Sequence, residues 1–394
     1  MNSSALTLSN MDEQKLHDFM KALPKTDLHC HLDGSLRIET VSELAQKPEN
    51  RSLAERLGYQ LPEDCSPDNL ASLLYPGVDC ESLEDYLLAF DITCAVLQNS
   101  ENLERAAYEL AMDCFAENIW YLEVRFAPQR HIHDELDGMG VLRAVNAGLA
   151  RAELETGIKA TIIVCAMRHF SKDISYFHRK VREVYPFSTA KELASHCSLE
   201  VARLAVEARR LELKRVVAFD LAGPEANFPP SHHTKAFYET INFLLPATVH
   251  AGEGYGPESI REAITYLNAQ RIGHGTRVLE EESDALLDYI RDHRIGIEVC
   301  LTSNLQTKAV ASLEDHPWNR LLEAEVRVSL CTDNRLVSGV SLTDEYTLAH
   351  RHFGFTPELL RRVVLYGFKS AFIAYGERRS LLLRAKRRLI ELGL

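Results

Sequence analysis

The stretch from which the fold can best be worked out is TDLHCHLDG, Thr26–Gly34. It is a short apolar run interrupted by polar residues, as expected for a β-strand. Successive side chains of a strand point to opposite faces, so His29 and His31 share one face and Cys30 lies on the other. Two imidazoles side by side at the end of a strand are candidate metal ligands.

Three later clusters also end short apolar runs: HAGE at 250–253, GHG at 273–275 and CTDN at 331–334. A third imidazole from His250 and a carboxylate from Asp333 would complete a ligand set for a hard-to-borderline cation, with zinc the leading candidate. Glu253 and His274 lie outside this set of ligands. They supply the acid and the base that a metal-activated water needs in order to react. The pattern therefore predicts a metal-dependent hydrolase.

Eight apolar runs alternate with amphipathic stretches and are the expected β-strands: 26–32, 120–127, 160–167, 215–221, 247–251, 270–274, 296–301 and 326–332. Near-continuous apolar strands indicate a parallel sheet covered by helices. An open doubly wound sheet fits this alternation nearly as well as a (β/α)8 TIM barrel. The candidate ligands, however, come from the first, fifth and eighth runs, and only a closed sheet brings its first and eighth strands together. We therefore predict an α/β fold, a (β/α)8 barrel with its site at the carboxyl ends of the strands.

Residues 1–394 are expected to form a single domain, in which a largely helical insertion of about 36–118 separates the first two strands. This insertion is a plausible lid over the barrel mouth, lined by Leu87, Leu88 and Phe90, although these side chains could equally pack the insertion itself. Helices are also predicted at 11–22, with Asn10 and Glu13 as the start signal, and at 102–118.

Composition narrows the class of protein. The net charge of −13 argues against nucleic acid or an anionic membrane surface as a partner. The nine cysteines are scattered and form no C-x-x-C pair, which is typical of reduced thiols. The first ten residues lack a signal-peptide pattern, and no run approaches the length of a membrane helix. A cytoplasmic location is the expectation, and the sequence leaves the oligomeric state open.

The motifs together closely resemble those of the adenosine deaminase family. They occur in the family's order and span nearly the whole chain: Pro24–Arg37, Asp220–Gly223, His250–Glu253, Ile272–Gly275 and Ser329–Asn334. A lone H-x-H is weak evidence, whereas five motifs in order are not a coincidence. The resemblance implies a (β/α)8 barrel, in agreement with the strand count.

The resemblance also implies roles in catalysis. One zinc ion would be held by His29, His31, His250 and Asp333. His274 and Asp333 would orient the attacking water and take its proton, and Glu253 would protonate purine N1. An alternative for Glu253 is that its carboxylate only orients the ligand His250.

Substrate recognition follows from the same resemblance. The Gly223 N–H would meet purine N3, although this glycine could equally serve a tight turn. Asp33 would contact the ribose 5′-hydroxyl, or else cap the turn before Gly34. Asn334 stands where many relatives have a second aspartate, and its amide can donate to purine N7. His31 is expected beside the substrate as well as on the metal.

The resulting expectation is hydrolytic deamination of adenosine and 2′-deoxyadenosine. Adenine, a nucleotide or an N6-modified nucleoside are alternative substrates, and Asp33 disfavours a 5′-phosphate because two negative charges would meet. The cytidine-deaminase pattern H-x-E with P-C-x-x-C is absent. A non-catalytic barrel with a binding or signalling role is a further alternative.

Several polar residues are expected to be structural. Glu123 and Arg125 share a face of the second strand, and Arg168 and His169 end the third, so an ion-pair network inside the barrel would explain them. Glu298 is a candidate partner for a catalytic histidine. The charged stretch 378–388 is expected to be a solvated helix face.

Overall fold

The computed structural model describes residues 8, 11–75, 83–211, 213–280 and 284–394. The described strands are β1 (Lys25–His31), β2 (Ile119–Phe126), β3 (Lys159–Met167), β4 (Val216–Ala222), β5 (Thr248–Ala251), β6 (Arg271–His274), β7 (Gly296–Val299) and β8 (Arg327–Leu330). Each of the eight predicted runs coincides with one of them, and the bounds differ by at most two residues at either end. The prediction worked because these runs are buried on both faces, which leaves few polar interruptions.

All strand pairs are parallel and join neighbours in the sequence. β1 to β4 form one four-stranded sheet and β5 to β8 form another. Two isolated bridges connect the sheets, Cys30 with Asp333 and Phe219 with Ala247. At the first bridge, the N–H of His31 donates to the Asp333 carbonyl at 2.7 Å. The strands therefore follow one another around a (β/α)8 barrel, in which β8 returns to β1.

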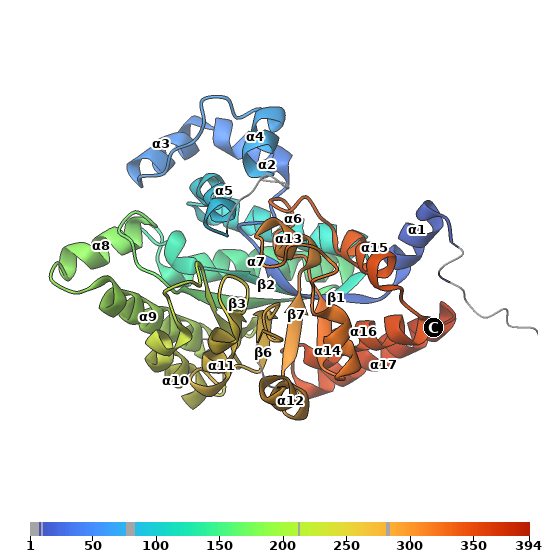
Figure 1. Ribbon diagram of the computed structural model, residues 1–394. Helices are drawn as coiled ribbons and strands as arrows, with labels where there is room; N and C mark the ends of the chain where they lie inside the picture. Colours follow the sequence, from blue (N-terminus) through green and yellow to red (C-terminus); the bar gives the residue numbers. More distant parts are fainter. Residues whose placement is uncertain (1–7, 9–10, 76–82, 212, 281–283) are drawn as a thin grey trace, which may run out of the picture.

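Helices connect the strands and cover the barrel on the outside (Figure 1). They are α1 (Glu13–Ala22), α2 (Ile38–Gln46), α3 (Pro48–Arg56), α4 (Pro67–Leu74), α5 (Leu83–Val96), α6 (Ser100–Ala116), η3 (Pro128–Arg130), α7 (Gly138–Thr156), α8 (Tyr176–Val184), α9 (Ala190–Arg210), η4 (Pro230–His233), α10 (Thr234–Asn242), α11 (Pro257–Thr265), α12 (Ala285–Asp292), α13 (Leu301–Gln306), α14 (Trp318–Glu323), α15 (Leu342–Phe353), α16 (Pro357–Ser370) and α17 (Tyr375–Glu391). The predicted helices at 11–22 and 102–118 are α1 and α6. Asp12 caps α1 by accepting from the Lys15 N–H, while the expected cap, Asn10, lies outside the described residues.

Among the described residues between β1 and β2, five helices occur. The last of them, α6, packs on α7 and β2, so it belongs to the outer layer of the barrel. The other four, α2 to α5, stand together on one side of the barrel, at the top of Figure 1. The segment 36–118 thus contains a barrel helix as well as a group of helices beside the strand ends. That the whole chain is one domain stays a prediction.

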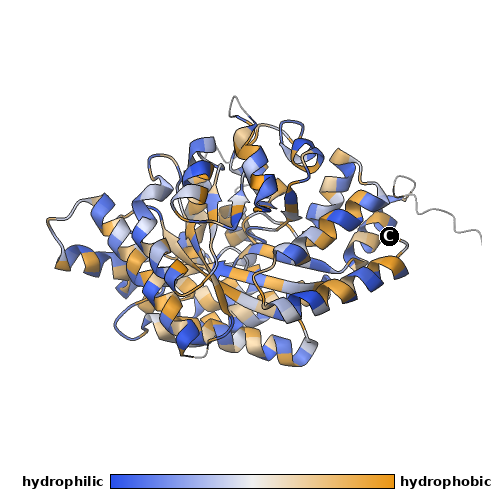
Figure 2. Ribbon diagram, turned by 90° about the horizontal axis from the view of Figure 1, so that it is seen from below, coloured by the Kyte–Doolittle hydropathy of each residue, from blue (hydrophilic) through white to orange (hydrophobic). Residues whose placement is uncertain are grey.

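The core lies between the strands and the inner faces of the helices. Figure 2 shows apolar strands in the middle, surrounded by helices on which apolar and polar residues alternate. All eight described cysteines are free and buried, and Cys80 lies outside the described residues. Within the described part of the chain, no helix is both long and apolar enough to cross a membrane.

Candidate active site

Histidines and a carboxylate from opposite parts of the barrel meet at the carboxyl ends of its strands. His29 and His250 come from β1 and β5, His274 ends β6, and Asp333 follows β8. These four residues offer ligand atoms that all lie within 4.8 Å of one another, and all four are buried. The fold therefore builds a compact cluster from residues more than 300 positions apart.

His31 also points to this cluster. Its Nε2 atom lies 3.1 Å from His250 Nε2 and 3.4 Å from Asp333 Oδ1. This group of four includes His274 and not His31, although the sequence suggested His31 as a ligand. Five side chains thus surround one point, and their partners must decide which of them would bind a metal.

The environment of His274 argues against its being a ligand. Its Nδ1 accepts from the Asn304 amide nitrogen at 2.9 Å. The hydrogen of the neutral ring is then on Nε2, which faces Glu253 Oε2 at 3.5 Å. Burial lowers the pKa of His274 well below its ordinary value, so the ring is neutral. A nitrogen that carries a hydrogen has no lone pair for a metal.

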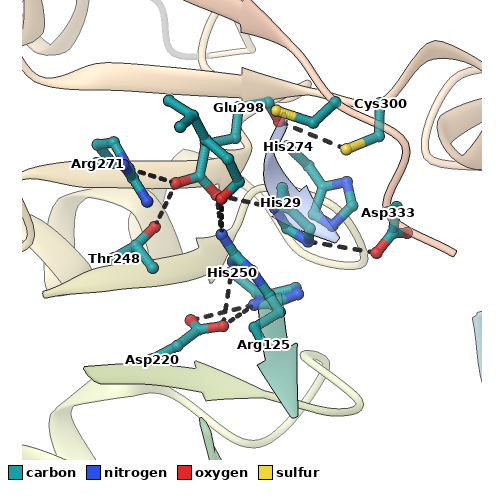
Figure 3. Close-up of polar contacts among 12 residues, drawn as sticks. His29, Arg125, Asp220, Thr248, His250, Arg271, His274, Glu298, Cys300 and Asp333 are labelled. Atoms are coloured by element: carbon teal, nitrogen blue, oxygen red, sulfur yellow. Dashed lines mark hydrogen bonds and ion pairs between the residues drawn. The ribbon is translucent and has the colours of Figure 1, made fainter. Parts of the chain in front are cut away.

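Carboxylates fix the other two rings. Glu298 Oε2 lies 2.8 Å from His29 Nδ1, and Asp220 Oδ2 lies 3.0 Å from His250 Nδ1 (Figure 3). Burial opposes ionisation of Glu298, but Arg125 and Arg271 hold its pKa well below the ordinary value. An ionised carboxylate can only accept, so each Nδ1 donates and each Nε2 keeps its lone pair. The buried Nε2 of His29 makes no hydrogen bond and lies 3.3 Å from Oδ1 of Asp333, another candidate ligand, which fits a metal-binding atom.

A network of buried charges supports these carboxylates. Arg125 lies 3.2 Å from Asp220 and 2.9 Å from Glu298, and it has no exposed surface. Arg271 pairs with Glu123 and, at 2.6 Å, with Glu298. The predicted ion-pair network inside the barrel is confirmed for Glu123 and Arg125. So is the expectation that Glu298 serves a histidine of the site. Arg168, by contrast, donates to the backbone carbonyls of Phe228 and His250, and His169 lines the pocket described below.

Glu253 occupies the turn after β5 and is nearly buried. Burial, together with the charges of Asp333 and Glu225, raises its pKa to about 8. Its Oε1 atom has no hydrogen-bond partner. Since Asp220 takes the Nδ1 position of His250, the alternative that Glu253 orients this ring is wrong. Glu253 is a neutral acid at pH 7, next to His274.

Glu225 positions that turn, a role that the sequence did not suggest. Its carboxylate accepts from four consecutive backbone N–H groups, those of residues 252 to 255, at 2.7 to 3.1 Å. The carboxylate therefore fixes the backbone of Glu253 and adds a negative charge beside it. Such clustered N–H groups form an anion site, which the protein fills with its own side chain.

Two residues of the site have unusual backbone geometry. His274 and Asp333 have φ values of 64° and 60°, in the left-handed region that non-glycine residues seldom adopt. Gly273 is required next to His274, because a Cβ there would come within 2.9 Å of His29 Cε1. Strain of this kind persists only where the surrounding structure enforces it, and it is common at functional sites.

A pocket of about 320 Å³ opens onto the cluster. The predicted substrate residues all line it, namely His31, Asp33, Gly223 and Asn334, together with Glu253, His274 and Asp333. Leu87 and Phe90 also line it, as predicted for the insertion, whereas the side chain of Leu88 is outside the described part of the structure. The pocket thus joins the acid, the base and the expected ribose contact.

Some polar atoms of the pocket already have hydrogen-bond partners within the protein, and others do not. Asp33 Oδ1 is buried without a partner, and Cys94 donates to Oδ2 at 3.8 Å. The Asn334 amide nitrogen already donates to the Tyr86 hydroxyl at 2.9 Å. Since an amide nitrogen carries two hydrogens, the second one could donate to purine N7. Tyr86 on α5 was not foreseen, since 248 residues separate it from Asn334.

Comparison with known proteins identifies the family. The family model described as adenosine deaminase matches residues 24–192 and 180–387. The chain belongs to the adenosine deaminase family. It is therefore a hydrolytic deaminase, and the (β/α)8 barrel is the fold of its structural neighbours.

Two relatives illustrate the similarity in sequence. An adenosine deaminase from Mycolicibacterium vanbaalenii is 38% identical over 375 residues, covering 92% of this chain and 93% of the relative. A probable adenosine deaminase from Dictyostelium discoideum is 38% identical over 356 residues, which are 90% of this chain. The match spans only 41% of that longer protein.

Solved structures show the same architecture. Arabidopsis ADAL complexed with IMP is 25% identical, with a TM-score of 0.74 and coverage of 95% of this chain and 99% of the other. A cog1816 amidohydrolase from Burkhoderia ambifaria, with bound Zn, has a TM-score of 0.76 at 20% identity, covering 99% and 96%. These similarities support the fold, and the buried His/Asp cluster of this chain is a candidate site for a metal ion.

Proposed function

We propose that the chain deaminates adenosine and 2′-deoxyadenosine hydrolytically, with one zinc ion, releasing ammonia and inosine or 2′-deoxyinosine. The observation that carries this proposal is the neutral, buried carboxyl of Glu253. It lies in the purine-sized pocket, 3.5 Å from His274 and beside the cluster of ligand atoms. A carboxylic acid that keeps its proton at pH 7 is suited to protonate a ring nitrogen.

His29, His31, His250 and Asp333 would hold the zinc ion. The fixed Nδ1 donors of His29 and His250 leave their Nε2 lone pairs facing the cluster, and His31 Nε2 lies within 3.4 Å of Asp333. When bound, the ion lowers the pKa of water so that a nucleophile is available at neutral pH. His274 stays off the metal, because Asn304 and Glu253 hold it in the tautomer described above, with its hydrogen on Nε2.

Different residues of the protein carry out the individual proton transfers. As water adds to C6 of the purine, electrons move onto N1, and Glu253 donates its proton there. His274 orients the water through the hydrogen on its Nε2, and Asp333 accepts the water's proton. Asp333 passes this proton to the 6-amino group, so that ammonia leaves. The added hydroxyl gives its proton back to Glu253, which leaves the 6-oxo purine. Ser303 donates to Asp333 Oδ2 at 2.6 Å and so fixes the direction of this carboxylate.

Asp33 is proposed to select a nucleoside. Burial, opposed by the charge of Arg130, raises the pKa of Asp33 to about 6, so its carboxylate is ionised at pH 7. The unpartnered Oδ1 can accept from a ribose 5′-hydroxyl. Asp91 and Asp173 line the same pocket, and Arg130 lies 2.6 Å from Asp91. These three carboxylates disfavour a 5′-phosphate.

Gly223 and Asn334 are proposed to contact N3 and N7 of the base. Gly223 has a φ of 102° and lines the pocket, which allows its backbone to approach a ligand closely. A cytoplasmic location is part of the same proposal, supported by the free, buried thiols of the described cysteines.

A substrate panel tests the proposal. Purified, zinc-replete protein is incubated with adenosine, 2′-deoxyadenosine, adenine, AMP and N6-methyladenosine, and the ultraviolet shift is followed. The two nucleosides should react with a kcat/KM at least about a hundredfold above that of AMP. A preference for AMP or an N6-methylated substrate would overturn the assignment of Asp33. It would leave the deaminase machinery in place.

A further inference from the structure

A second cleft lies at the opposite end of the barrel, among the amino ends of β5 to β8. Its volume is about 430 Å³. Among the described residues, five cationic side chains and no acidic one line it: Arg271, Arg294, Arg327, Lys369 and Arg378. They come from the starts of β6 and β8, the loop before β7, the end of α16 and the first turn of α17. Such a concentration of positive charge is unexpected in a chain with a net charge of −13.

Most of these cations have no counter-charge. Arg271 is accounted for by Glu123 and Glu298. The ion pairs found among the described residues include none with Arg294, Arg327, Lys369 or Arg378. In the neighbouring cleft, Glu153 pairs with Lys159 and with Arg215. That cleft thus holds a carboxylate of its own, whereas no described acidic residue lines the cleft among the amino ends of β5 to β8.

The unpaired cations act on one another. Burial, followed by the charges of Arg294 and Arg378, lowers the pKa of Arg327. Burial and the charges of Arg327 and Lys386 likewise lower the pKa of Lys369. The positive charges of these neighbouring side chains repel one another. Partial burial strengthens the repulsion, because it reduces screening by water and salt. An anion between these residues would remove the repulsion.

The other wall of the cleft is apolar. It consists of residues at the end of α10 and before β5, with an aromatic ring from the loop before α17: Ile241, Leu244, Leu245, Pro246 and Phe372. Leu244 is 87% exposed. A cleft with cations on one side and an apolar wall on the other suits a ligand that combines several phosphates with a flat, weakly polar ring.

We propose that this cleft binds a nucleoside di- or triphosphate, with its phosphates on Arg294, Arg327, Lys369 and Arg378 and its base against the apolar wall. The cleft is separate from the purine pocket, which opens at the other ends of the strands. Binding there is independent of the deaminase reaction.

Calorimetric titration tests the proposal. Zinc-replete protein is titrated with UTP, whose pyrimidine base is not a substrate for purine deamination, and with inorganic tripolyphosphate and orthophosphate. UTP should bind most tightly, tripolyphosphate next and orthophosphate least, and all should weaken as salt is raised. The double variant R327Q/K369Q should lose at least tenfold in affinity for UTP.

A matched control distinguishes binding in the cleft from a general effect of the protein's net charge. The double variant R203Q/R210Q changes the net charge equally on α9, where both arginines pair with glutamates of their own helix. It should bind UTP as the wild type does, and K369Q alone should give an intermediate affinity. Absence of UTP binding at millimolar concentration, equal weakening in both double variants, or binding of an acidic peptide in place of UTP would overturn the proposal.

Discussion

The two ends of the barrel differ in how their charged side chains are paired. At the carboxyl ends of the strands, Asp220 and Glu298 each hold one histidine and share Arg125 between them. At the amino ends, Arg327 and Lys369 face one another's charge without a carboxylate. A site that must tune proton transfer needs internal partners in fixed positions, because each partner sets a pKa or a tautomer. A cluster of cations that has no carboxylate partners within the protein can instead bind an anionic ligand from solution.

Removal of His250 should have the largest effect on the carboxyl-end site. The H250A variant leaves Asp220 ionised without its imidazole and deletes one proposed ligand. We expect the zinc content to fall below about a tenth of one equivalent and deamination to be undetectable. Metal analysis after dialysis measures this. The exposed His293, changed to alanine, is the control, and a zinc content in H250A equal to that of H293A would contradict the ligand assignment.

Loss of the Glu225 charge should have a smaller effect. In E225Q an amide replaces the carboxylate that accepts from residues 252 to 255, so the turn carrying Glu253 loses hydrogen bonds and shifts. We expect kcat to fall by about ten- to a hundredfold with KM nearly unchanged, because positioning of the acid is impaired and not binding of the nucleoside.

Steady-state kinetics with adenosine check this prediction, with zinc content measured on the same sample. The exposed Glu258 at the start of α11, changed to glutamine, removes the same charge close by. If E258Q and E225Q lose activity equally, Glu225 has no specific role in positioning Glu253.

The pH profile should reflect the raised pKa of Glu253. The acid acts while protonated, so kcat/KM should fall as pH rises through about 8, the pKa to which burial and neighbouring carboxylates raise it. In E225Q this alkaline limb should move to lower pH, since one of the charges that favour the protonated form is gone. A limb at the same pH in both proteins would show that Glu225 does not act on Glu253 electrostatically.

The amino-end variant should have the smallest effect on catalysis. R327Q/K369Q leaves Arg271 and its pairing with Glu298 intact, so we expect kcat and KM for adenosine within about twofold of the wild type. The free energy of unfolding should stay the same or rise, because repulsion between cations is removed. Kinetics and thermal denaturation measure both. A large loss of activity would show that the two ends are not independent.

The sequence was sufficient to predict the strands and the meeting of their ends. Each strand is an apolar run buried on both faces, and His29, His250 and Asp333 stand where such runs stop. Closure of the sheet then followed from chemistry, because ligands on the first and last strands must share one metal.

Side-chain pairing could not be predicted in this way. Asp220 serves His250 where Glu253 was the alternative, and the choice depends on distances between separate strands. Tyr86 reaches Asn334 from a helix of the insertion. The amino-end cleft gave no sequence signal, because its cations are contributed by elements whose neighbours are set only by the closed barrel.

The most direct test of the account is the activity of E253Q with its zinc content measured in the same preparation. Glutamine keeps the shape of Glu253 but has no proton to transfer. We predict a full zinc equivalent, unchanged thermal stability within a few degrees and a loss of about a hundred- to ten-thousandfold in kcat for adenosine. A zinc-replete E253Q that deaminates adenosine at nearly the wild-type rate would contradict the assignment of Glu253 as the acid.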